Sequence, residues 1–130
     1  MIAQGSSILV VDDDDAFRNR LVRALCDRGH FARGAATYEE AIASAKNEPP
    51  EFGVIDIRVS ERSGLDLAQD LRRFFPTIHI VLLTGPRSTG LAAVDLRMAN
   101  VSKPADADDI LAALDRARSL AADRSTQSRE

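Results

Sequence analysis

The sequence Ser-Ile-Leu-Val-Val-Asp-Asp-Asp-Asp occupies residues 7–15 and joins a short apolar run directly to four consecutive carboxylates. Residues 8–11 are apolar at every position, which is typical of a strand in a parallel sheet that is covered on both faces. Asp12 and Asp13 then follow the carboxyl end of this strand. Crowded carboxylates repel one another, so the cluster either binds a cation or stays solvated as a loop that caps the next helix.

The composition of the whole chain limits the classes of protein that it can be. Its 130 residues are 45% hydrophobic and 28% charged, which is ordinary for one globular domain. The net charge of −3 provides no general attraction to nucleic acids or anionic membranes, so we expect this domain to bind neither directly. The lone cysteine, Cys26, favours a reducing compartment, and no apolar run reaches the roughly 18 residues of a membrane span. We therefore expect a cytoplasmic protein.

Apolar runs and helical periodicities alternate along the chain. The predicted strands are 8–11, 30–35, 52–57, 78–83 and 100–102, and the predicted helices are 15–28, 37–47, 64–75, 89–98 and 107–121. Five alternating pairs of this kind predict an α/β fold in which helices cover both faces of a parallel sheet. We expect one domain at residues 1–122, followed by a flexible tail or the start of a linker at residues 123–130.

Polar residues stand where the predicted strands end. They are Asp12, Asp13, Asp56, Thr84 and Lys103. In open parallel sheets, ligands bind beyond the carboxyl ends of the strands, so these side chains are expected on one rim. Each also has a simpler interpretation, such as a solvated charge, a helix cap or a strand terminator. The whole set together favours a site.

The chemistry of this set suits phosphoryl transfer. Carboxylates and water are the ligands that Mg²⁺ prefers. Asp56 is the expected nucleophile because carboxylates form aspartyl phosphates. The Thr84 hydroxyl and the Lys103 ammonium would help to neutralise the phosphoryl oxygens.

Four short motifs resemble the receiver domain of bacterial two-component response regulators. They are Val10-Val11-Asp12-Asp13, Val54-Ile55-Asp56-Ile57 with Gly64 eight residues after Asp56, Leu82-Leu83-Thr84-Gly85, and Lys103-Pro104. The resemblance covers roughly residues 6–120. It implies a flavodoxin-like, doubly wound (βα)5 fold with strand order 2-1-3-4-5. The stretch Lys-Pro-Ala-Asp-Ala-Asp at residues 103–108 is also similar to the redox-responsive regulators of photosynthesis and respiration.

The resemblance implies a phosphorelay function. Asp56 would accept a phosphoryl group from a sensor histidine kinase or a phosphotransfer protein, and Thr84 and Lys103 would contact that group. Asp13, Asp56 and the backbone carbonyl of Arg58 would ligate Mg²⁺, with Asp12 assisting through water. The Lys103–Pro104 bond would be cis. The domain would assist only its own phosphorylation and dephosphorylation, so it would not be an enzyme in the ordinary sense.

The output is less determined by the sequence. The phosphorylated state would act on a downstream protein target or a fused output domain, and the domain would be a monomer or weak dimer. Receivers commonly carry an aromatic switch residue three positions before the lysine, where this chain has Asn100, and the segment from Thr84 to Lys103 is short. Alternatives are therefore a phosphate-independent interaction module or the regulatory fragment of a longer DNA-binding regulator. A magnesium-dependent phosphohydrolase is disfavoured because Arg58 occupies the position of its second acid.

Overall fold

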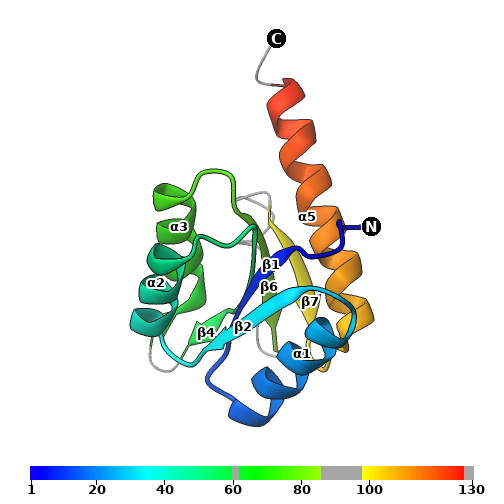
Figure 1. Ribbon diagram of the computed structural model, residues 1–130. Coiled ribbons are helices and arrows are strands. Elements are labelled where there is room, and N and C mark those ends of the chain that lie inside the picture. The colour runs from blue at the N-terminus through cyan, green and yellow to red at the C-terminus, as the bar shows by residue number, and fades with distance from the viewer. Residues whose placement is uncertain (60–61, 86–97, 128–130) are drawn as a thin grey trace.

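The computed structural model describes residues 1–59, 62–85 and 98–127 (Figure 1). Its centre is a sheet with the strand order β2-β1-β3-β6-β7, in which all neighbouring strands are parallel. These strands are β1 (Ser7–Val11), β2 (Phe31–Ala35), β3 (Phe52–Asp56), β6 (His79–Thr84) and β7 (Ala99–Ser102). Because β6 and β7 are the fourth and fifth strands of this sheet along the chain, the predicted order 2-1-3-4-5 is confirmed.

Helices cover both faces of the sheet, as predicted. Helices α1 (Asp15–Asp27) and α5 (Ala107–Gln127) pack on one face, and α2 (Tyr38–Asn47) and α3 (Gly64–Phe74) pack on the other (Figure 1). The sheet therefore has a separate apolar layer on each side. None of the described helices is long and apolar enough to span a bilayer.

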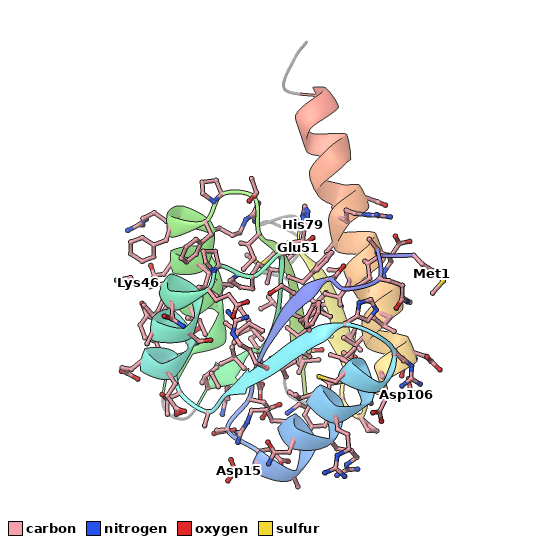
Figure 2. All side chains as sticks on the ribbon, in the orientation of Figure 1. Met1, Asp15, Lys46, Glu51, His79 and Asp106 are labelled. Atoms are coloured by element: carbon pink, nitrogen blue, oxygen red, sulfur yellow. The ribbon has the colours of Figure 1, made fainter. Side chains whose placement is uncertain are left out.

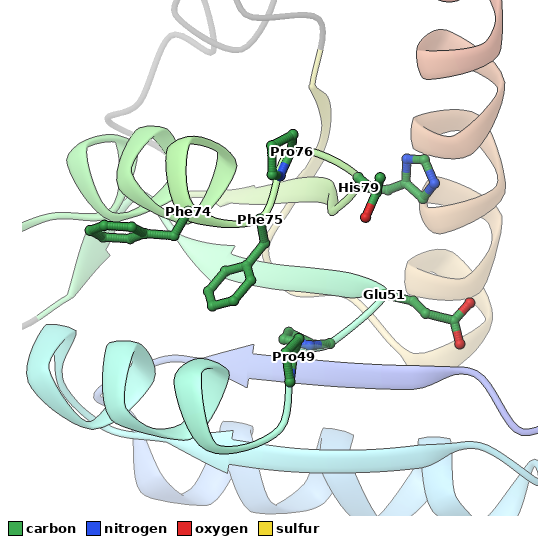
Figure 3. A pocket seen from close by; sticks show the side chains of 8 residues that line it. Pro49, Glu51, Phe74, Phe75, Pro76 and His79 are labelled. Atoms are coloured by element: carbon green, nitrogen blue, oxygen red, sulfur yellow. The ribbon is translucent and has the colours of Figure 1, made fainter.

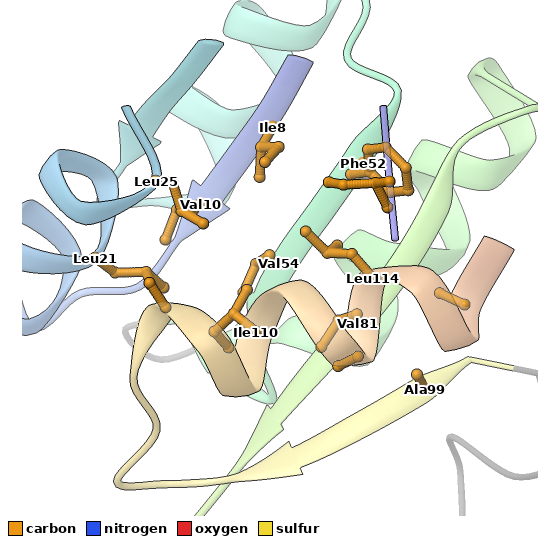
Figure 4. Close-up of a cluster of buried hydrophobic side chains, with 14 of the residues drawn as sticks. Ile8, Val10, Leu21, Leu25, Phe52, Val54, Val81, Ala99, Ile110 and Leu114 are labelled. Carbon is orange, nitrogen blue, oxygen red and sulfur yellow. The ribbon is translucent and has the colours of Figure 1, made fainter. Parts of the chain in front are cut away.

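The alternation of side chains along β1 connects the two layers. Ile8 and Val10 point toward α1 and α5, where they join Leu25 and Leu114 in one cluster (Figure 4). Leu9 and Val11 belong to the cluster under α2 and α3. All four strand residues are fully buried, so the apolar run of residues 8–11 forms the doubly covered strand that the sequence predicted.

Two features differ from the prediction or add to it. A small antiparallel pair, β4 (Arg58–Val59) with β5 (Arg62–Ser63), lies between β3 and α3 and was not predicted. Helix α5 continues to Gln127, because residues 121–127 contain no glycine or proline that would end it. Its last turns project from the body of the domain (Figure 1). Of the helix predicted at 89–98, residues 89–97 lie outside the described part of the chain, and the proposed boundary at residue 122 stays a prediction.

Candidate functional site

The predicted site residues come together at the carboxyl edge of the sheet. Asp12 directly follows β1, and Asp56 is the last residue of β3. A side-chain oxygen from each of Asp12, Asp13 and Asp56 lies within 4.8 Å of the other two. This is the convergence that the parallel strands predicted. Among the residues that the structure describes, these three acids are the group able to hold a metal ion.

Lys103 places its positive charge among these acids. Its Nζ atom lies 2.6 Å from Oδ2 of Asp12 and 3.1 Å from Oδ2 of Asp56. The same ammonium lies 4.7 Å from the centre of the Phe17 ring, which gives it a cation–π contact. The backbone N–H of Lys103 donates to the carbonyl of Thr84, and the Lys103–Pro104 bond is cis, as predicted. One lysine therefore bridges two of the three carboxylates.

Asp12 and Asp13 differ sharply in their surroundings. The Asp12 side chain has no exposed area, whereas Asp13 is exposed to solvent. Burial raises the pKa of the Asp12 carboxyl, although hydrogen bonds from Lys103 and from the Asp14 backbone N–H act in the opposite direction. Asp12 is thus a buried acid that depends on Lys103, while Asp13 presents its carboxylate at the mouth of the site.

The electrostatics keep Lys103 charged. Burial alone would lower its pKa, but hydrogen bonds to Asp12 and Asp56, together with the negative charges of both, outweigh burial and raise the pKa above its ordinary value. Lys103 is therefore an ammonium at neutral pH. It can offset part of the negative charge of the three acids, and a divalent cation would complete that balance.

Asp56 is oriented by its own backbone surroundings. Its Oδ1 atom accepts a hydrogen bond of 3.1 Å from the backbone N–H of Arg58, while Oδ2 faces Lys103. The N–H of Ile57 donates to the Leu83 carbonyl, which holds the end of β3 against β6. Both oxygens of Asp56 therefore have a defined direction. The role of the Arg58 carbonyl as a metal ligand stays a prediction.

Thr84 lies on the same edge of the sheet, and its side chain also contacts the neighbouring strand β7. It ends β6, is 5% exposed, and is paired in register with Ser102 of β7. Its hydroxyl donates a 3.4 Å hydrogen bond to the Val101 carbonyl. Thr84 thus contacts β7 directly. Asn100, at the position where receivers commonly carry an aromatic residue, lies on that strand with its side chain exposed.

Two residues shape the site in ways that the sequence did not indicate. Phe17 is one of them, because its ring lies beside the Lys103 ammonium. Its place in the first turn of α1, two residues after the end of the acidic run, was the available signal. Gly64 was noted for its spacing from Asp56, but only the structure shows that its N–H donates to the carbonyl of Ile57 at 2.7 Å.

The donor set fits a hard divalent cation. Three carboxylates with oxygen atoms within 4.8 Å of one another offer the ligands that Mg²⁺ and Ca²⁺ take in proteins. The cluster combines the exposed carboxylate of Asp13 with the buried carboxylate of Asp12. No His or Cys belongs to it, so a zinc-type centre does not fit these residues.

A cavity of about 530 Å³ lies at the other end of the sheet (Figure 3). It is lined by Pro49, Phe75 and His79 among others, and none of the predicted site residues lines it. Figure 2 shows Asp15, next to the acidic cluster in sequence, and His79 at opposite ends of the molecule. His79 is partly buried, with its ring 5.4 Å from that of Phe52, so it packs at the start of β6.

The chain matches proteins of known family. Residues 8–115 match the family model described as "Response regulator receiver domain". The chain is 44% identical over 117 residues to the acid tolerance regulatory protein ActR of Rhizobium meliloti (strain 1021), covering 88% of this chain and 60% of ActR. It is 41% identical over 116 residues to the photosynthetic apparatus regulatory protein RegA of Rhodovulum sulfidophilum, covering 87% of this chain and 63% of RegA. The chain thus spans less than two thirds of these relatives, and RegA fits the predicted similarity to photosynthesis regulators.

A solved structure is also similar over most of the chain. It is a response regulator from Burkholderia pseudomallei with a phosphorylated aspartic acid, a calcium ion and citrate. The TM-score is 0.79 at 33% identity, and the match covers 94% of this chain and 74% of that one. The fold of the present chain is therefore shared by a response regulator in which an aspartate carries a phosphoryl group.

Proposed function

The chain belongs to the response regulator receiver domain family, and we propose that Asp56 is its phosphoacceptor. The observation that carries this proposal is the position of the Asp56 carboxylate. It lies 3.1 Å from the Lys103 ammonium and within 4.8 Å of two further carboxylates at the carboxyl edge of the sheet. The two oxygens of Asp56 are separately oriented, one by the Arg58 N–H and one by Lys103, and its side chain is 14% exposed, whereas that of Asp12 has no exposed area.

The proposed reaction is a phosphoryl transfer from a phosphohistidine. A carboxylate oxygen of Asp56 forms a bond to phosphorus while the bond between phosphorus and the histidine nitrogen breaks, and the donor leaves as histidine. Lys103 remains protonated and compensates negative charge on the phosphoryl oxygens. The Thr84 hydroxyl, on the same edge, is the second candidate contact.

A magnesium ion is the cofactor that we propose. When bound, it would neutralise phosphoryl oxygens and hold them in line with Asp56. Asp13 and Asp56, with the Arg58 carbonyl, are the proposed ligands, and Asp12 would act through water. Lys103 lies 2.6 Å from Asp12 and 3.1 Å from Asp56, and the carboxylate of Asp13 is exposed to solvent, from which a metal ion would enter.

The proposed partners follow from phosphorelay function. The donor would be a sensor histidine kinase or a phosphotransfer protein, and the phosphorylated domain would bind a downstream target or a fused output domain differently. The domain itself would assist only its own phosphorylation and dephosphorylation. We further propose a monomer or weak dimer.

The experiment is an intact-mass measurement after incubation with acetyl phosphate and MgCl₂, followed by peptide mapping. The wild-type protein should gain one phosphoryl group on Asp56, and chelation of the metal should prevent the gain. Asp56→Asn should not gain it. Glu51→Gln is the control, because Glu51 lies by the cavity at the other end of the sheet. Phosphorylation of Asp56→Asn at the wild-type rate would contradict the assignment, and an unmodified wild type would favour the phosphate-independent module.

A further inference from the structure

Arg18 of α1 is more deeply buried than is usual for an arginine on a surface helix. Its side chain is 13% exposed, whereas Arg20 and Arg23 of the same helix are exposed residues. Its Nη1 atom donates a 2.7 Å hydrogen bond to the backbone carbonyl of Asp12. Its Nη2 atom lies 2.7 Å from Oδ1 of Asp15. Arg18 thus spans the loop that carries the acidic cluster.

The carbonyl that Arg18 binds belongs to the peptide unit between Asp12 and Asp13. A peptide unit is planar, so a contact that fixes the direction of the Asp12 carbonyl also fixes the direction of the backbone N–H of Asp13. The other groups of Asp12 are already held: its N–H donates to the Ala35 carbonyl at 3.1 Å, and its Oδ1 accepts from the Asp14 N–H at 2.9 Å. Arg18 adds the contact that orients the chain as it leaves Asp12 toward Asp13.

Strand β2 provides the space through which Arg18 reaches this carbonyl. The aliphatic part of its side chain crosses Gly34, where an added Cβ would lie 2.9 Å from Cδ of Arg18. Because the crowded neighbour is a side chain, a larger residue at this position would displace Arg18 while the strand stays in place. Gly34 therefore gives a way to move Arg18 without altering any charge.

We propose that Arg18 is a positioning residue for the metal site: it orients the Asp12–Asp13 peptide so that the Asp13 carboxylate stays beside those of Asp12 and Asp56. The inference deepens the proposed function, on which its relevance to phosphorylation rests. Metal binding itself can be measured without any phosphoryl donor.

An electrostatic role and a positioning role of Arg18 predict opposite changes in Mg²⁺ affinity when its charge is removed. A guanidinium beside a cluster of acids repels a divalent cation, so a purely electrostatic effect would make Mg²⁺ bind more tightly to Arg18→Met. A loss of positioning would make it bind more weakly. Arg18→Lys keeps the charge but not the planar fork, so it should recover only part of the loss.

The test is a titration of the unphosphorylated protein with Mg²⁺, in which the chemical shifts of the backbone amides report binding. Arg18→Met should weaken Mg²⁺ binding by roughly tenfold, in the range found when groups that orient metal ligands are removed. Gly34→Ala should weaken it in the same direction, and Arg20→Met, which removes an exposed arginine from the same helix, should leave it unchanged. If Arg18→Met does not fold, the Mg²⁺ affinity of Gly34→Ala tests the proposal by itself.

Unchanged or tighter Mg²⁺ binding in the folded Arg18→Met and Gly34→Ala proteins would overturn the inference. A second readout uses acetyl phosphate: the Mg²⁺ concentration that gives half-maximal phosphorylation should rise, while the rate at saturating Mg²⁺ should change little. A merely structural role would lower the melting temperature without that rise. If the wild type is not phosphorylated at all, the proposed function fails, and the Mg²⁺ titration still decides the role of Arg18.

Discussion

A Cβ atom added to Gly64 would lie 1.7 Å from the backbone carbonyl oxygen of Asp56. The first residue of α3 thus rests against the backbone of the proposed phosphoacceptor, and its N–H binds the next carbonyl, that of Ile57, at 2.7 Å. The neighbouring atoms are backbone atoms, which cannot rotate away. Glycine is required here by close approach, and the contact ties the start of α3 to the end of β3.

Gly64→Ala should therefore destabilise the fold and disturb Asp56 together. We expect a loss of about 2–3 kcal/mol in the free energy of unfolding, as for overpacking in a rigid site, and slower phosphorylation by acetyl phosphate. Chemical denaturation measures the first effect and intact mass the second. Gly85→Ala is the control: an added Cβ there meets no atom of the residues that the structure describes within 4 Å, so its stability should change by less than about 0.5 kcal/mol. Equal stability of the two variants would contradict the steric argument.

Lys103→Met should expose the cost of burying Asp12. The substitution removes the ammonium that lies 2.6 Å from a carboxylate with no exposed area. We expect a loss of about 3 kcal/mol in chelator-containing buffer, because an unpaired buried charge remains. The double variant Lys103→Met/Asp12→Asn should recover part of that loss, since it removes the charge as well. A double variant as unstable as the sum of the two single ones would show that the pair is not coupled.

Asp13→Asn should stabilise the metal-free protein and abolish magnesium-dependent phosphorylation. The Asp13 carboxylate lies within 4.8 Å of two other acids, and a neutral amide removes one repulsive charge from the cluster. We expect a gain of up to about 1 kcal/mol at low ionic strength in the presence of chelator. Thermal melts at about 1 M salt, where charges are screened beyond about 3 Å, should show a smaller gain. A variant that is phosphorylated normally would remove Asp13 from the proposed metal ligands.

His79 should make the fold sensitive to mild acid. Burial, followed by the charge of Arg118, lowers the pKa of His79 below its ordinary value of 6.5, although Glu51 acts in the opposite direction. The unfolded chain then binds a proton that the folded state excludes. The contribution of neutral His79 is fully present above about pH 6.5 and is lost as the pH falls through the lowered folded pKa.

The measurement compares the free energy of unfolding of the wild type and His79→Gln across this pH range. The difference between the two proteins should be constant above about pH 7 and should change as the pH falls, because the variant lacks the titrating ring. A pH dependence identical in both proteins would show that other groups account for the loss of stability in acid.

The sequence alone determined the architecture and the location of the site. The wholly apolar run at residues 8–11 is typical of a strand that is covered on both faces of a parallel sheet, and β1 lies inside such a sheet, between β2 and β3. In such a sheet the carboxyl ends of the strands meet at one edge, so Asp12, Asp56 and Lys103 had to be neighbours once the strands were identified. The boundaries were less certain, because the end of α5 and the β4–β5 pair depend on weak local signals.

Only the tertiary structure decided how chemically identical residues differ in burial and in contacts. Asp12 and Asp13 are adjacent and equal in the sequence, yet one is fully buried against Lys103 and the other is exposed. The contacts that make them unequal come from β2, α1 and the end of β7, whose positions no local pattern encodes. The contact of Gly64 with the Asp56 backbone and the packing of Arg18 on Gly34 likewise depend on how these elements meet in the folded sheet. Local sequence determines where a strand ends, whereas the burial and partners of each carboxylate depend on segments that are distant in the chain and meet only in the folded sheet.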